Sequence, residues 1–208
     1  MNEQSYLTIT NFIKDYPNSY VGFWEIAISI SYNGYNEELE NAYNNLSVKI
    51  KQSEVAKVFE NNITNAKTLK IGSYFPKIKL KNKGLKEVEF ITKKNSSPNY
   101  TLIDFWFSYC GPCIAQFPKL KKLHAEYNSN QLKIISISTD KTKNIDNWYK
   151  VMEKHTIPWL NLLDENGVKT TGLGVNSFPT NYLLNKEGII LKKNISLVEL
   201  EELLKEVE

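Results

Sequence analysis

Apolar residues in the first third of the chain recur at the spacing of an α-helix. In "SYVGFWEIAISISYN", residues 19–33, a set of large side chains falls on one helical face: Tyr20, Phe23, Trp24, Ala27 and Ile30. The alternation of Ile26, Ile28 and Ile30 also fits a short strand, so both interpretations stay open. Ser19 is a suitable helix N-cap, and the "NG" at residues 33–34 is a suitable end.

The helical spacing continues to about residue 65. "NEELENAYNNLSVKI", residues 36–50, places Leu39, Tyr43 and Leu46 in register, and "SEVAKVFENNI", residues 53–63, adds Val55, Val58, Phe59 and Ile63. Aromatic and aliphatic side chains at this spacing are more typical of a packed core than of a cofactor site. Residues 1–70 are therefore predicted to form a small helical bundle that packs on another part of the chain.

The pattern changes near "KTLKIGSYFP", residues 67–76. Short apolar runs follow, and they alternate with helical stretches such as "CIAQFPKLKKLHAEYN" and "NIDNWYKVMEKH". The runs are "KIKL", "EVEFIT", "YTLIDFWF", "LKIISIST", "PWLNLL", "TNYLLN" and "IILKK". Alternating strands and helices predict an α/β fold, and the "KEG" between the last two runs predicts an antiparallel hairpin. Residues 71–208 are predicted to form this second domain.

Composition narrows the class of protein. Of 208 residues, 41% are apolar and 24% are charged, which is typical of a globular chain. The formal net charge is only +3, and the lysines are interspersed with acidic residues, so no nucleic-acid partner is expected. No apolar run approaches the ~20 residues that span a bilayer, and "MNEQSYLTITNFIKDYP" lacks the pattern of a signal peptide. No membrane span is expected.

The chain has only two cysteines, in "DFWFSYCGPC", residues 104–113. Cys110 follows an apolar strand and opens a predicted helix, whose unpaired N–H groups stabilise an anion. The pKa of its thiol should therefore fall below the usual ~8.5, and Cys113 lies one turn further on. Pro112 fits the first helical turn, and Gly111 permits a tight entry into it. This placement favours a redox pair.

Two other interpretations of the cysteines are weaker. A zinc site needs about four ligands, and His124 and His155, the only histidines, do not have finger-type spacing. No metal or other cofactor is expected. The alternative of two inert buried cysteines leaves their position at the strand–helix junction unexplained.

The segment "LIDFWFSYCGPC" resembles the active site of the thioredoxin superfamily. "IGSYFPKIKL", "CGPCIAQFPKL" and "GVNSFPTNYLLNKEGII" resemble the TlpA-like thiol–disulfide oxidoreductases of the bacterial cell envelope, over residues 71–208. The helical segment before residue 71 resembles the one in Bacteroidetes relatives, which are usually longer and exported. The resemblance implies a thioredoxin-like fold, a cell-envelope or periplasmic location, and a cis bond between Phe178 and Pro179 that exposes backbone to a substrate strand.

The resemblance also assigns roles to residues near the pair. TlpA-like proteins commonly carry a glutamate where this chain has Gln116, whereas thioredoxins use an aspartate at the position of Asp104. Asp104 is therefore the expected proton acceptor for Cys113, with Cys110 as the nucleophile. Trp106 and Tyr109 flank the cysteines and are expected, with Gly111 and Pro112, to shape the substrate site.

The predicted activity is exchange of dithiol and disulfide with protein partners, with an upstream thiol as electron donor. "Gly-Pro" between the cysteines favours a reductase over an oxidant. The alternative is a non-catalytic binding module with a redox-regulated disulfide. A peroxidase resembling the peroxiredoxins is disfavoured, because they use a threonine where this chain has Phe107, and an arginine, which this chain lacks.

Overall fold

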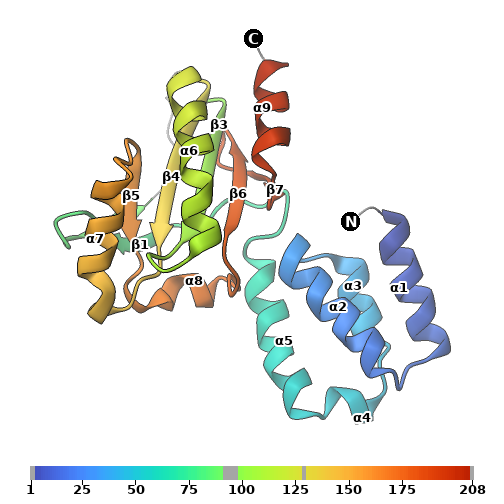
Figure 1. Ribbon diagram of the computed structural model, residues 1–208. Coiled ribbons are helices and arrows are strands. Elements are labelled where there is room, and N and C mark those ends of the chain that lie inside the picture. Colours follow the sequence, from blue (N-terminus) through green and yellow to red (C-terminus); the bar gives the residue numbers. More distant parts are fainter. Residues whose placement is uncertain (1–2, 91–97, 128–129, 207–208) are drawn as a thin grey trace.

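The first part of the chain is a set of helices. The computed structural model describes residues 3–90, 98–127 and 130–206. Its first helices are α1 (Glu3–Asp15), α2 (Tyr20–Asn33), α3 (Glu37–Asn44), α4 (Val48–Lys51) and α5 (Glu54–Lys67) (Figure 1). Ser19 caps α2 by accepting a hydrogen bond from the Gly22 N–H at 3.1 Å, and Gly34 ends the helix. The helix prediction for residues 20–33 is confirmed, and the strand alternative is wrong.

The core of this bundle uses part of the predicted apolar face. Phe23, Ile26, Ala27 and Ile30 of α2 are buried together with residues of the neighbouring helices, Leu39, Tyr43, Phe59 and Ile63. Tyr20 and Trp24 were predicted to lie on the buried face of α2, but both are exposed. Val55 and Val58 of α5 are also exposed. The buried stripe runs through Phe23, Ile26 and Ile30, and the other apolar side chains lie beside it.

A seven-stranded sheet forms the second part, within the described residues. Its strands are β1 (Ile78–Lys81), β2 (Glu87–Phe90), β3 (Tyr100–Trp106), β4 (Leu132–Ser138), β5 (Leu160–Leu163), β6 (Thr180–Asn185) and β7 (Ile190–Lys193). Their order is β2-β1-β5-β4-β3-β6-β7. The pairs β3–β4 and β4–β5 are parallel, and β6–β7 is the predicted antiparallel hairpin. Residues 91–92, the end of one predicted strand, lie outside the described part.

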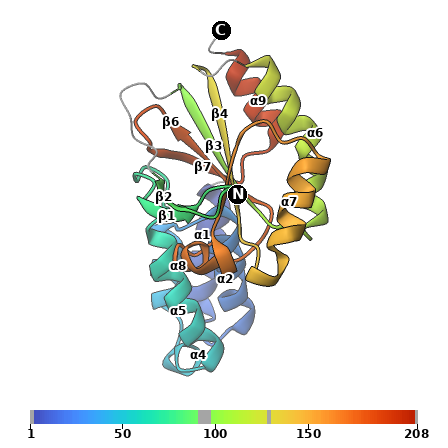
Figure 2. The same cartoon turned by 90° about the vertical axis from the view of Figure 1, so that its left-hand side faces the viewer.

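Helices cover one face of the sheet. The helices α6 (Gly111–Glu126), α7 (Ile145–Lys154) and α9 (Leu197–Lys205) lie on the same side of it (Figure 2). Their apolar side chains pack with Trp106 of β3 and Leu132 of β4 into one core. Because Cys110 and Cys113 belong to this core, the cysteine pair is anchored where α6 meets the sheet.

The opposite face of the sheet has a different cover. Leu69 and Phe75, which precede β1, pack on it together with Leu173 after the short helix α8 (Val168–Gly172). Leu69 falls inside the predicted bundle segment, so the change from bundle to sheet packing lies before residue 69. No helix in the described part of the chain has both the length and the apolarity needed to cross a membrane.

Candidate active site

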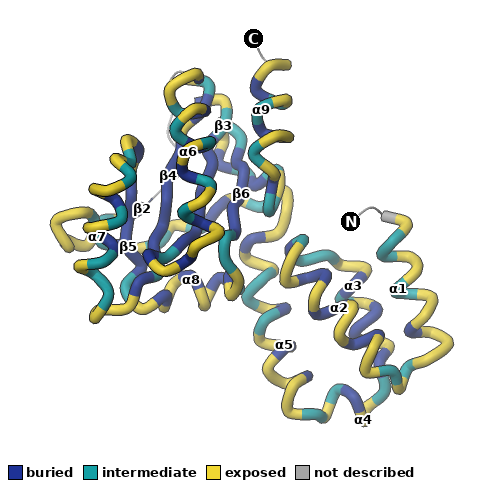
Figure 3. The backbone as a smooth tube through the Cα atoms, in the orientation of Figure 1, coloured by how far each residue is buried: buried dark blue, intermediate teal, exposed yellow. Residues whose placement is uncertain are grey.

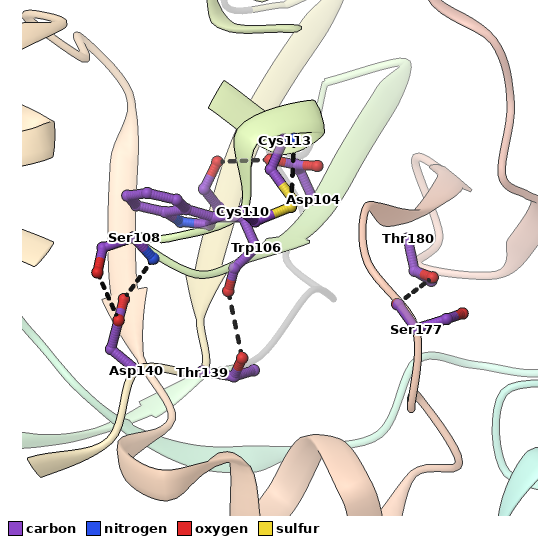
Figure 4. The surroundings of a disulfide bond; sticks show 10 residues. Asp104, Trp106, Ser108, Cys110, Cys113, Thr139, Asp140, Ser177 and Thr180 are labelled. Carbon is purple, nitrogen blue, oxygen red and sulfur yellow. Dashed lines mark hydrogen bonds between the residues drawn. A yellow bond between two sulfur atoms is a disulfide. The ribbon is translucent and has the colours of Figure 1, made fainter. Parts of the chain in front are cut away.

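The cysteines lie at the junction between β3 and α6. Cys110 and Cys113 form a disulfide with a Cα–Cα distance of 5.2 Å (Figure 4). Cys110 is the N-cap of α6, and its Sγ accepts a hydrogen bond from the Cys113 N–H at 3.2 Å. The sulfur of Cys110 therefore lies at the positive end of the helix dipole, where a thiolate is stabilised after reduction. Cys110 is 5% exposed and Cys113 is 2% exposed.

The two residues between the cysteines form the outer surface of the first helical turn. Gly111 and Pro112 are both exposed. A Cβ built on Gly111 would meet nothing within 4 Å, and the residue does not adopt a left-handed conformation. The expected steric need for glycine at the helix entry is therefore not supported by the backbone. The space beside Gly111 is open, and the residue lies on the exposed surface of the first turn.

Asp104 is buried in β3, the strand that leads to the cysteine pair. It belongs to β3, where it pairs with Ser136 of β4 and Asn181 of β6. In the view of Figure 4 its carboxyl group is drawn beside Cys113. Burial raises the pKa of Asp104 from 3.8 to about 7, against a smaller lowering by the Ser136 hydroxyl, which donates at 3.2 Å. A carboxyl group with this pKa exchanges protons near neutral pH.

Sequence reasoning missed the hydrogen bonds that support Asp104. The Trp159 Nε1–H donates to Ser136 Oγ at 2.8 Å, and all three side chains are buried. Ser136 Oγ thus accepts one hydrogen bond and donates another to Asp104. Ser136 lies in β4, and Trp159 lies in the segment before β5. The apolar residues around them indicated that both side chains point inward, but not which groups they contact.

A second buried carboxylate, also missed, holds the turn before Cys110. Asp140 accepts hydrogen bonds from the Ser108 N–H at 2.9 Å and from the Ser108 hydroxyl at 2.7 Å. The hydroxyl of Ser138 donates to the same carboxylate at 2.7 Å. The Trp106 carbonyl accepts from the Thr139 N–H at 2.9 Å and from the Thr139 hydroxyl at 3.3 Å, the second of which is drawn in Figure 4. These contacts fix the path from β3 to α6 on which the position of Cys110 depends.

Phe178 and Pro179 lie in the loop before β6. The peptide bond between them is cis, as predicted. The ring of Phe178 packs edge-to-face on that of Phe107, with 5.4 Å between the ring centroids. The Phe107 carbonyl accepts a hydrogen bond from the Cys110 N–H at 2.9 Å. The sequence-distant loop is therefore in contact with the turn that carries the first cysteine.

The two aromatic residues predicted to flank the cysteines differ in position. Tyr109 is 64% exposed and lines the surface next to Phe107. Trp106 is fully buried, and its ring packs edge-to-face on Phe117 of α6 at 5.1 Å. The prediction that Trp106 contacts substrate is therefore corrected: its side chain points to the face of β3 that the helices cover, where it packs under α6.

A disulfide at the N-terminus of the helix that follows a parallel strand, with a buried aspartate on that strand and a cis-proline loop in contact with the turn before the first cysteine, defines a thioredoxin-like thiol–disulfide oxidoreductase. The chain belongs to the AhpC/TSA family, whose model matches residues 71–193. The matched region contains β1 to β7 and both cysteines. It leaves out the helical bundle.

Several similar proteins are named thiol-disulfide oxidoreductases. The chain is 23% identical over 154 residues to the thiol-disulfide oxidoreductase ResA of Bacillus thuringiensis, a match over 72% of this chain and 86% of that one. A solved thiol-disulfide oxidoreductase from Bacteroides fragilis is 28% identical, with a TM-score of 0.55, over 65% of this chain and 100% of that one. Both matches therefore exclude about a third of this chain.

One solved structure also covers the helical bundle. A thioredoxin-like protein from Bacteroides caccae matches 98% of this chain and 76% of its own length, with a TM-score of 0.70 and 21% identity. The arrangement of a helical segment followed by a thioredoxin-like sheet therefore has a precedent in fold.

Proposed function

We propose that this protein is a reductase of protein disulfides. The observation that carries the proposal is the Cys110–Cys113 disulfide at the N-terminus of α6, together with the buried carboxyl group of Asp104 on the strand that precedes it. A sulfur at the helix start can act as a nucleophile, a second sulfur one turn on can resolve the product, and a carboxyl group with a pKa near 7 can take the proton. Gly111 and Pro112 between the cysteines support the reducing direction.

The reaction begins from the dithiol form. The Cys110 thiolate attacks a substrate disulfide, so that one substrate sulfur forms a mixed disulfide with Cys110 and the other leaves as a thiolate. Asp104 takes the proton of the Cys113 thiol, and the Cys113 sulfur then attacks Cys110. The second substrate thiolate leaves, the Cys110–Cys113 disulfide forms, and two electrons have passed to the substrate. An upstream protein dithiol restores the reduced form.

Substrate contacts are assigned to the exposed surface around Cys110. Tyr109, Gly111 and Pro112 form its edge, and Phe178 and Pro179 lie beside it through the contact with Phe107. An extended peptide laid along the loop before β6 would bring its disulfide to Cys110. The resemblance to TlpA-like proteins supports a location in the cell envelope.

The proposal is tested by insulin reduction and by the equilibrium potential of the cysteine pair against glutathione. Reduced protein should precipitate insulin chains, and the double variant C110S/C113S should not. The potential should lie near the roughly −270 mV of reducing thioredoxins. A potential near about −120 mV would make the protein an oxidant and would refute the direction proposed here.

Peroxide reduction, the activity of the related peroxiredoxins, is the alternative enzymatic function. The position of the peroxidase threonine is held by Phe107, whose ring is packed on Phe178, and the sequence has no arginine to polarise a peroxide. Consumption of hydrogen peroxide at the rate of insulin reduction would favour the rival. A binding module would instead bind disulfide peptides without turnover.

A further inference from the structure

A groove lies between the helical bundle and the loop that leads to the cis-proline. It is lined by α2, by α5 and by the segment from Gly174 to Ser177, and its volume is about 440 Å³. This size falls within the range of pockets that bind small ligands or several side chains, ~300–1,000 Å³. None of the residues that line it is charged. The lining itself therefore favours an uncharged ligand.

The groove walls are made by the apolar residues that the bundle core leaves outside. Trp24 and Ile28 of α2 and Val55 and Val58 of α5 all line it, and all are exposed. Exposed stretches are visible along both helices in Figure 3. Contiguous exposed apolar surface of this kind marks an interaction site more often than an accident of folding.

Both helices that line the groove contact the sheet domain. At the C-terminal end of α2, Lys193 Nζ donates to the Ser31 carbonyl at 2.5 Å and Asn194 Nδ2 donates to the Tyr32 carbonyl at 2.6 Å. At the end of α5, Gly174 lies so close that a Cβ there would be 2.9 Å from the Ala66 nitrogen. The bundle wall and the loop wall are therefore tied to each other.

Two further hollows lie between the groove and the surface at Tyr109, the residue before Cys110. Asn176 lines both the groove and a neighbouring hollow that contains Phe178 and Thr139. Thr139 in turn lines a third hollow, with Phe107 and Tyr109. The three hollows therefore follow one another, each sharing a lining residue with the next, from the apolar groove past Phe178 to Tyr109.

We propose that the groove binds an extended apolar segment of a polypeptide substrate and thereby presents the substrate's cysteine to Cys110. The proposal rests on the reductase function and adds the substrate class: disulfides flanked by aromatic and aliphatic residues. The side chains of Asn62, Asn176 and Ser177 add hydrogen-bonding groups among the apolar walls, as an extended peptide backbone requires. The succession of hollows that leads toward Tyr109, next to Cys110, favours this occupant over a second copy of the chain.

The test compares two synthetic peptides of equal length and charge. Each carries one cysteine as a mixed disulfide with glutathione, flanked by Phe, Leu and Ile in one peptide and by Ser and Gly in the other. The reduced full chain should reduce the apolar peptide with a kcat/KM about tenfold higher, since burial of one large side chain suffices for that factor. Ile28→Glu and Val58→Glu should remove the preference. All variants should reduce glutathione disulfide at the parental rate.

Val21→Glu is the matched control. Val21 lies on α2 like Ile28 and is 66% exposed, against 58% for Ile28, but it does not line the groove. This variant should keep the preference for the apolar peptide. Equal rates for both peptides with the parent protein, or a preference that Ile28→Glu leaves intact, would overturn the proposal.

A binding measurement separates this proposal from the proposed activity. Trp24 is half exposed in the groove, whereas Trp106, Trp148 and Trp159 are buried, so quenching by iodide reports on Trp24. A serine-for-cysteine version of the apolar peptide should protect Trp24 in the parent and not in Ile28→Glu. Protection without any disulfide reduction would refute the activity and support the groove. A parental dimer that Ile28→Glu converts to a monomer would overturn the groove's assignment to substrate.

Discussion

Strand β3 buries every residue after its first, whereas helix α2 leaves Trp24, Ile28 and Tyr32 at the surface. Both segments are among the most apolar in the chain. The strand lies inside the sheet, between β4 and β6, with a core on each face, so each of its apolar side chains packs in one of the two cores. The helix has a core on one side only. Its remaining apolar side chains are exposed and can bind another molecule. In our proposal the groove that they line, and not the disulfide, therefore determines which substrates are preferred.

The largest effect expected in the sheet domain comes from the cysteines. Cys110→Ser should abolish reduction of insulin, because the nucleophile is lost. Cys113→Ser should also stop turnover, but it should accumulate mixed disulfides between Cys110 and substrate, since the resolving sulfur is absent. Mass spectrometry of the intact protein after reaction with a disulfide peptide distinguishes the two. If Cys110→Ser accumulates the adduct and Cys113→Ser does not, the assignment is reversed.

Asp104→Asn should slow resolution of the mixed disulfide by roughly 10²–10⁴-fold, the range for loss of a general base. The first attack by Cys110 should change less, because it needs only a thiolate. In the parent, the resolution rate should rise with pH through about 7, the pKa to which burial raises Asp104, and the variant should lack this rise. Stopped-flow measurement of the attack by Cys110 and of the resolution by Cys113, in the parent and the variant, tests this role of Asp104. Parental resolution rates in the variant would make the aspartate structural.

A stability measurement on the oxidised protein checks the same pKa without catalysis. Between pH 4 and 7 the folded protein holds a proton on Asp104 that the unfolded chain releases, so stability falls as pH rises through this window. From pH 5 to 8 the parent should lose roughly 2–3 kcal/mol of unfolding free energy on this account, and Asp104→Asn should not. Equal pH slopes in urea unfolding would contradict the raised pKa.

The catalytic pair could be predicted from the sequence because its signal is local. Cys110 and Cys113 lie within one turn of each other, and the apolar strand before them fixes their place in the fold. Ser136 and Asp140 support the site from a different strand and its following turn, so their roles depend on strand pairing that no local pattern specifies. The depth of Trp106 was also missed, since an aromatic residue near a cysteine pair looks the same whether it faces the core or the solvent.

The sequence predicted the helices of the bundle, but not which of their apolar residues are exposed. Helical spacing identified α2 and α5, and Ser19 identified the start of α2 correctly. The spacing could not separate the buried stripe of Phe23 and Ile30 from the exposed flank of Trp24, because both recur at three or four residues. Which stripe is buried depends on where α5 and the loop at Gly174 lie, and that is a property of the tertiary structure.

Removal of the bundle sharpens the comparison between the two regions. We propose that residues 71–208 carry the redox chemistry and that residues 1–70 contribute none of it. A fragment of residues 66–208, which keeps Leu69 for the sheet core, should reduce glutathione disulfide at close to the full-chain rate. It should lose the roughly tenfold preference for the apolar peptide, because α2 and most of α5 are gone. Circular dichroism and cooperative unfolding establish whether the fragment is folded. A folded fragment that fails on glutathione disulfide would assign chemistry to the bundle.

The smallest expected effect concerns the contact that joins the two regions. Asn194 has a positive φ of 53°, its Nδ2 donates to the Tyr32 carbonyl, and its Oδ1 accepts from the Asn181 N–H at 3.3 Å. Asn194→Gly tolerates this backbone conformation and removes both side-chain hydrogen bonds, so urea unfolding should show a loss of about 1–2 kcal/mol. Asn194→Ala should lose about 1 kcal/mol more, because alanine is strained at positive φ.

The kinetic consequence of the same substitution decides whether the contact positions the groove. With the end of α2 no longer held to β7 by Asn194, the Asn194→Gly variant should bind the apolar serine peptide more weakly in the Trp24 quenching assay, while its rate with glutathione disulfide stays parental. Asp104 lies on β3 and the disulfide lies at the start of α6. Neither element accepts or donates any of the Asn194 side-chain hydrogen bonds described above. A variant that is less stable yet keeps parental peptide affinity would show that Lys193 and the packing of Gly174 on Ala66 are enough to fix the groove.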